Sequence, residues 1–209
     1  MTGLETSASN STSPALRIAA DGDIDRVADL ITDAFDHLTV IHFLVRDPAR
    51  RRPVVRDWYR LWVEHAISGA GQVVMTEAGD AAAVWFDRTG TAGEPEDYTR
   101  RLTALAGDDL SRFEHLDAQM DAHHPGEAHW HLLFLAVRPD RQNRGLGGAL
   151  MQHTHARLDD AGTAAYLEAT GEDNRRLYRR HGYIDMTPAT LPVAPGIRLY
   201  RMWRPAQDT

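Results

Sequence analysis

The sequence predicts a single α/β domain in which a mixed central sheet of about six or seven strands is flanked by helices. Strand-like apolar runs and segments of helical periodicity follow one another along the chain. Two such runs enclose a helical segment that begins near Gly148, and this unit implies a parallel strand pair with a right-handed crossover. A length of 209 residues with 43% hydrophobic content suits one domain with a sizeable core.

The chain divides into a short tail and this domain. Residues 1–14 are rich in Ser and Thr without periodic pattern, so we expect a disordered tail before a domain at residues 15–209. The expected strands cover residues 15–19, 71–75, 81–86, 164–169, 183–186 and 197–203, besides a central strand that begins at Leu133. The expected helices follow Asp21 or Asp23, follow Pro53, span 95–123 with a break near Gly107, and span 148–161 and 173–180. Trp85 is expected in the core of the sheet.

Composition and charge exclude several classes of function. A net charge of −7 argues against a nucleic-acid partner, because contacts to phosphate backbones need a basic surface. The absence of cysteine excludes disulfides, thiol nucleophiles and Cys-ligated zinc. The chain shows neither a membrane-length apolar run nor a signal-peptide pattern, so we expect a soluble, cytoplasmic protein without a membrane partner. His129 and His131 share one face of a strand, yet no further ligand sits at matching spacing, so no metal is predicted.

The turn after the central strand is suited to an anion. Residues 142–148 combine glycines and a basic side chain immediately before a helical pattern begins. The first N–H groups of a helix lack partners and lie at the positive end of its dipole, so a phosphate can bind there. Asn143 tolerates a positive φ, and glycine lets a ligand approach the backbone. A P-loop lysine is missing, and a dinucleotide fingerprint would need glycine where Leu150 stands.

The strand, the turn V-x-P-x-x-Q-x-x-G-x-G and the helix resemble the acyl-CoA loop of the GCN5-related N-acetyltransferases, the GNAT superfamily. Residues 174–183 also resemble the superfamily pattern N-x-x-x-x-Y-x-x-x-G-[FY] in the spacing from Tyr178 to the Gly-aromatic pair. Asn174 and Tyr178 stand four residues apart on one helix face, so they point the same way. The resemblance implies a GNAT fold and acetyl-CoA as co-substrate.

The resemblance also implies roles for individual residues. The cofactor-binding positions that it implies are Leu135, Ala136, Val137, Gln142, Asn143, Arg144, Gly145, Leu146, Gly147, Gly148, Asn174 and Tyr178. A backbone N–H near Leu135, where strands of the superfamily splay, would polarise the acetyl carbonyl, and Val137 and Asn174 would hold the pantetheine arm. Tyr178 would donate a proton to the departing sulfur. These roles describe direct transfer to an amine without an acyl-enzyme.

The general base has three candidates. His131 is expected on the same strand face as Leu133 and Leu135, and it resembles a histidine that arylalkylamine acetyltransferases of the superfamily use through water. Glu168 ends the neighbouring strand and could accept the proton or hold an ammonium group. Water alone is the third candidate.

Residues from about Ala81 to Pro205 further resemble the puromycin N-acetyltransferase type. The pieces that carry this are the run Ala83-Val84-Trp85, the His-His-Pro segment followed by Trp130 and Leu132, Tyr166-Leu167-Glu168, and the closing run from Arg198 to Met202. The resemblance implies a primary amine of a small molecule as acceptor, such as an aminonucleoside antibiotic or another secondary metabolite, and hence a part in antibiotic resistance. Two alternatives stay open: a peptide or protein amine as acceptor, and a catalytically silent acyl-CoA sensor. A homodimer is possible.

Overall fold

The computed structural model describes residues 14–90 and 93–207, so the predicted tail lies outside the described residues except for Pro14. The strands are β1 (Leu16–Ile18), β2 (Gly71–Thr76), β3 (Ala81–Asp87), β4 (His129–Val137), β5 (Ala164–Ala169), β6 (Ile184–Ala194) and β7 (Ile197–Arg204). The helices are α1 (Ile24–Phe35), α2 (Thr39–Leu44), α3 (Pro48–His65), α4 (Tyr98–Ala106), α5 (Leu110–His123), α6 (Leu146–Asp160) and α7 (Glu172–Arg180). No helix in this part of the chain is both long and apolar enough to cross a membrane.

These strands form one sheet of seven strands in the order β1-β2-β3-β4-β5-β7-β6. β4 and β5 are parallel, and every other neighbouring pair is antiparallel. The predicted mixed sheet is therefore confirmed, including the parallel pair on either side of α6. Ligands of such sheets bind beyond the carboxyl ends of the parallel strands, so the ends of β4 and β5 are where a site is expected.

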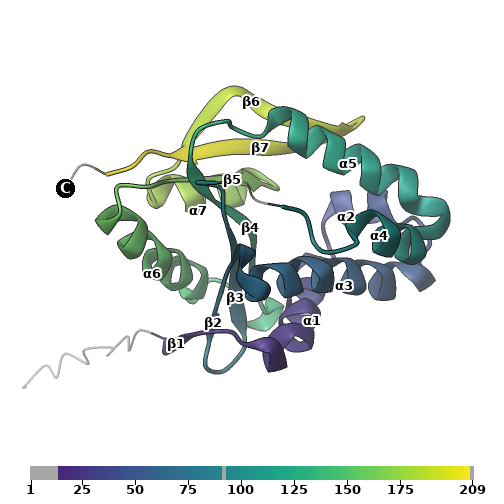
Figure 1. The fold of residues 1–209 in the computed structure, drawn as a ribbon, viewed down its shortest axis with the longest axis horizontal. Coiled ribbons are helices and arrows are strands. Elements are labelled where there is room, and N and C mark those ends of the chain that lie inside the picture. Colours follow the sequence, from purple (N-terminus) through teal and green to yellow (C-terminus); the bar gives the residue numbers. More distant parts are fainter. Residues whose placement is uncertain (1–13, 91–92, 208–209) are drawn as a thin grey trace, which may run out of the picture.

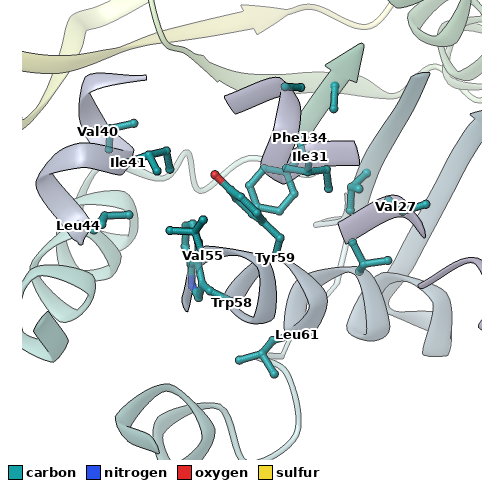
Figure 2. Packing of buried hydrophobic residues seen from close by; sticks show 14 of the residues in the cluster. Val27, Ile31, Val40, Ile41, Leu44, Val55, Trp58, Tyr59, Leu61 and Phe134 are labelled. Carbon is teal, nitrogen blue, oxygen red and sulfur yellow. The ribbon is translucent and has the colours of Figure 1, made fainter. Parts of the chain in front are cut away.

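Helices cover both faces of the sheet (Figure 1), with α6 and α7 on one side and α1 to α5 on the other. Two hydrophobic clusters match these two layers. The larger cluster packs α1 and α3 against β4, where the rings of Tyr59 and Phe134 meet edge to face at 5.1 Å between centroids (Figure 2). Trp85 has no exposed surface and lies in the smaller cluster, as predicted.

Several element boundaries differ from the sequence prediction. The helix expected after Pro53 begins at Pro48, because Asp47 caps it by accepting a hydrogen bond from the Ala49 amide at 2.9 Å, and proline is tolerated in a first turn. The segment 36–48, expected as a connection, contains the helix α2. β4 begins four residues earlier than predicted, and β6 extends eight residues beyond the predicted end at Met186, because it pairs with β7 as a hairpin.

A β-bulge in β4 corrects the predicted orientation of its side chains. Leu132 pairs with Trp85 and Phe134 pairs with Val84, so Leu133 is an extra residue between two consecutive partners on β3. An extra residue shifts the two-residue alternation by one. Leu135 therefore packs on the α6 face, together with Leu132, whereas His131 lies on the opposite face. The prediction that His131 and Leu135 share a face is wrong.

Candidate active site

A groove with a volume of about 830 Å³ runs along the carboxyl ends of β4 and β5. Its walls come from β4, from the turn before α6, and from α7. The predicted binding residues that line it are Leu135, Val137, Gln142, Asn143, Gly145, Leu146, Gly147, Gly148, Asn174 and Tyr178. The structure thus brings the two motifs of the sequence to one groove, although they lie some thirty residues apart in the chain.

The turn before α6 presents backbone amides to this groove. Gly145 is the N-cap residue of α6 with a φ of 80°, and Asn143 adopts a φ of 61°, as its residue type predicts. The first hydrogen bond of the helix joins the Ala149 amide to the Gly145 carbonyl at 3.0 Å, so the amides of residues 146–148 precede the bonded ladder. A Cβ at Gly145 would meet nothing within 4 Å, so this part of the groove is open. Such a turn fits a diphosphate.

Two basic residues of the groove were missed by the sequence prediction. Arg141 and Arg180 line it, whereas Arg144, the predicted basic contact, is exposed and outside the lining. Ala136, also predicted, is fully buried in the cluster on the opposite face and contributes no side chain. The only signal for Arg180 was its place two residues after Tyr178, on the same short helix.

β4 and β5 separate at the groove. Their paired residues end at Leu132 and Leu167, whereas β4 continues to Val137 and β5 to Ala169. The backbone groups of β4 beyond this point have no β5 partner, which matches the splay expected near Leu135. Such groups are free to bind an extended ligand that runs between the strands.

Asn174 and Tyr178 line this groove from α7. The Asn174 side-chain amide donates a hydrogen bond to the Thr170 hydroxyl at 2.8 Å, which connects the start of α7 to the end of β5. Tyr178 is buried, and burial raises its pKa well above the ordinary value. The hydroxyl therefore stays protonated at neutral pH and can donate a proton to a group in the groove.

A second, smaller cavity of about 240 Å³ adjoins this groove. It is walled by α2 to α5 and by the bulged part of β4, with aromatic side chains that include Trp58, Tyr59, Trp62 and Tyr98. The residues that line both the groove and the cavity are Phe35, Leu38, Leu133, Glu168 and Thr170. The bulged residue and the carboxylate at the end of β5 therefore stand where the two spaces meet.

Glu168 and His131, predicted as alternative bases, form one hydrogen-bonded pair. His131 Nε2 lies 2.7 Å from Glu168 Oε2, and both side chains are almost entirely buried. Burial alone would raise the pKa of Glu168. The charge and the hydrogen bond of His131, together with the Tyr166 hydroxyl, have the larger effect, so the pKa is lowered. Glu168 Oε1 and His131 Nδ1 are buried without a hydrogen-bond partner among the described residues. Unsatisfied buried atoms at a junction of two cavities indicate a place for a ligand.

Two further histidines surround this pair. The two Nε2 atoms of His129 and His124 lie 3.1 Å apart, and the rings of His124 and His131 are 5.0 Å apart between centroids. Burial lowers the pKa of His124 to about 3, so it is neutral at physiological pH. His124 and Glu168 join this group in space, although neither stands at a matching spacing in the sequence. Nevertheless, the described residues contain no set of three ligands arranged for a metal ion.

Comparisons with known proteins agree with this geometry. Residues 112–185, which run from α5 to the start of β6, match the family model of the acetyltransferase (GNAT) domain. This part of the chain is similar to the GNAT acetyltransferase domain. The protein is an N-acetyltransferase, and its co-substrate is acetyl-CoA.

Solved structures of GNAT proteins have the same fold. The chain is similar to a histone acetyltransferase HPA2 and related acetyltransferase from Corynebacterium glutamicum, with 24% identity, a TM-score of 0.73, and 95% of this chain and 99% of that chain covered. A Drosophila melanogaster polyamine N-acetyltransferase has 20% identity and a TM-score of 0.62, with 90% and 97% covered. The PaiA N-acetyltransferase from Thermoplasma acidophilum, solved with coenzyme A, has 9% identity and a TM-score of 0.55, with 93% and 99% covered.

Proposed function

We propose that the protein transfers the acetyl group of acetyl-CoA to a primary amine of a small, largely apolar molecule by direct attack. The observation that carries this proposal is that Glu168, paired with His131, stands where the long groove meets the small cavity. Two substrates that approach from the two spaces would meet beside a carboxylate. A direct transfer also agrees with the absence of cysteine, which removes the thiol nucleophile of an acyl-enzyme route.

The groove would hold acetyl-CoA. The amides of residues 146–148 and the guanidinium groups of Arg141 and Arg180 would bind the diphosphate, because they combine free N–H groups with positive charge. The separated backbone of β4 and the Asn174 side chain would bind the pantetheine arm. When bound, acetyl-CoA supplies an activated thioester.

Glu168 would accept the proton of the attacking amine. Its Oε1 atom has no hydrogen-bond partner in the part of the chain that the structure describes. Glu168 lines both spaces, whereas His131 lines only the cavity. His131 would orient the carboxylate through its hydrogen bond to Oε2. Tyr178, kept protonated by burial, would donate its proton to the leaving sulfur.

The size of the cavity favours a small acceptor. Pockets for drug-sized ligands enclose roughly 300–1,000 Å³. A cavity of about 240 Å³ takes a smaller amine, or one arm of a larger one. An aminonucleoside antibiotic would keep part of its structure outside, so a compact amine is the better candidate.

The test is thiol release from acetyl-CoA by the purified full chain over a panel of compact primary amines, with an aminonucleoside and a short peptide included. We expect turnover with apolar amines and weaker turnover with the peptide. Turnover only with the peptide would favour a macromolecular acceptor, and binding of acetyl-CoA without turnover of any amine would favour the silent sensor.

A further inference from the structure

We propose that the acceptor of this enzyme carries a second cationic group, which Asp117 binds at the far end of the small cavity. The inference rests on the proposed function and specifies its substrate as a diamine with an apolar spacer. Asp117 lies on α5, whereas none of the residues assigned to the transfer itself lies on that helix.

Helix α5 forms one long wall of the cavity. The residues that it contributes are Leu116, Asp117, Met120, Asp121 and the capping residue His124. Their spacing of three or four places them on one helix face. The His124 ring meets the His131 ring edge to face at the transfer site, and Asp117 precedes His124 by seven residues. At ~1.5 Å per residue, the two positions are about 10 Å apart along the helix axis. The helix thus sets the distance between the reacting amine and the second group.

Asp117 is a carboxylate that is held by a neutral hydrogen-bond donor. The Tyr98 hydroxyl donates a hydrogen bond to Asp117 Oδ2 at 2.9 Å, and the Trp58 indole N–H donates to that hydroxyl at 3.1 Å. No ion pair joins Asp117 to a basic side chain within residues 14–90 and 93–207. A partly buried carboxylate that is held by neutral donors is stabilised when a cation binds to its second oxygen.

The electrostatic surroundings of Asp117 favour a cation further. Burial raises its pKa to about 6, and the neighbouring carboxylates of Asp121, Glu94 and Glu114 add to the shift, while the bond from Tyr98 opposes it. Asp117 is therefore mainly ionised at neutral pH. Asp121 and Glu94 line the same cavity and add negative charge near Asp117. Arg88 also lines the cavity, but its electrostatic interactions are with Asp121 and Glu168.

The cavity walls provide independent support for a ligand. The Tyr59 residue is 1% exposed, and its hydroxyl and the Trp62 indole N–H are both buried without a hydrogen-bond partner among the described residues. Figure 2 shows the Tyr59 hydroxyl pointing away from α3 into the space between Ile41 and Phe134. Aromatic faces bind ammonium groups through cation–π attraction, and unsatisfied buried polar atoms indicate a bound polar ligand. An alkylammonium chain with apolar sides suits such walls.

The experiment compares unbranched diamines of increasing length with monoamines of equal length, in the full chain and in the Asp117→Asn variant. Each compound is titrated calorimetrically into the protein with coenzyme A present, and its kcat/KM is measured by thiol release. We expect a long diamine to bind at least about tenfold more tightly than its matched monoamine, and Asp117→Asn to remove this preference without changing monoamine binding. Asp108→Asn, an exposed change of the same kind just before this helix and outside the cavity, should retain the preference.

The outcomes separate this inference from the proposed function. Equal binding of diamines and monoamines by the wild-type chain, or equal loss of both in Asp117→Asn, overturns the second-cation site even if amines are acetylated. A diamine preference in binding that Asp117→Asn removes supports the site, and if no amine is then acetylated, only the proposed function fails. A tenfold preference that survives in Asp117→Asn also overturns the assignment.

Discussion

The pair formed by Glu168 and His131 gives the sharpest test of the transfer chemistry. In Glu168→Gln an amide of the same shape replaces the carboxylate, so the proton acceptor is lost while a hydrogen bond to His131 Nε2 can still form. A positioned general base contributes roughly 10²–10⁴ in rate, so kcat should fall by that factor, or about 2.7–5.4 kcal/mol of transition-state stabilisation. Coenzyme A affinity should change less than about twofold, because the proposed diphosphate site at the turn before α6 does not include Glu168.

The structure also predicts how two substitutions combine. Because the two side chains are joined at 2.7 Å, the His131→Gln variant removes the group that orients the same carboxylate. The double variant should therefore lose about as much rate as Glu168→Gln alone, as expected for residues that act as a unit. The assay is steady-state thiol release with the best amine of the panel, together with calorimetric titration of coenzyme A and thermal melting.

Glu77→Gln, in the exposed turn between β2 and β3, is the control for loss of one surface carboxylate and should leave kcat unchanged. If Glu168→Gln reduces kcat less than twofold, the carboxylate is not the proton acceptor. If the losses of the two single variants multiply in the double variant, Glu168 and His131 act separately and the pair is not the catalytic unit.

Three further predictions follow from the same geometry. Tyr178→Phe should lower kcat at least about tenfold with little change in coenzyme A affinity, and unchanged turnover would remove the hydroxyl from the mechanism. Gly145→Ala should destabilise the fold by about 1–2 kcal/mol, because its φ of 80° is costly for a residue with a Cβ. Gly147 lies inside α6, and a Cβ there would make an ordinary 3.5 Å contact to the Leu135 side chain. Gly147→Ala should therefore leave the stability of the fold unchanged or raise it slightly, and the melting temperatures of the two glycine variants distinguish these effects. The diamine-to-monoamine ratio of kcat/KM should fall as pH falls through about 6, where Asp117 becomes protonated, and a flat ratio would contradict its role.

The sequence was sufficient to predict the mixed sheet, the parallel pair and the turn that precedes α6. These features depend on local signals, since strand periodicity, glycines and a helix start lie within a few residues of one another. The positive φ of Asn143 follows from its residue type for the same reason.

The acceptor side could not be predicted, because its walls come from segments far apart in the chain. Asp117 and Tyr98 belong to different helices, and neither occurs in a recognisable motif. The pairing of His131 with Glu168 depends on the parallel register of β4 and β5, in which His131 stands opposite Tyr166. Sequence periodicity contains no information on that register across thirty-seven residues.

The bulge at Leu133 explains why one strand can serve both substrates. Without the extra residue, strict alternation would place His131, Leu133 and Leu135 on one face, so that the pair with Glu168 and the wall of the groove would compete for the same side of the sheet. With it, Leu135 and Val137 line the groove beside α6, while His131 and Phe134 line the cavity beside α3. Leu133 itself lines both spaces. The pairing of β4 with β5 also ends at Leu132, directly before the bulged residue, as expected because a bulge bends its strand. The backbone groups of β4 beyond this point are then free for the pantetheine arm.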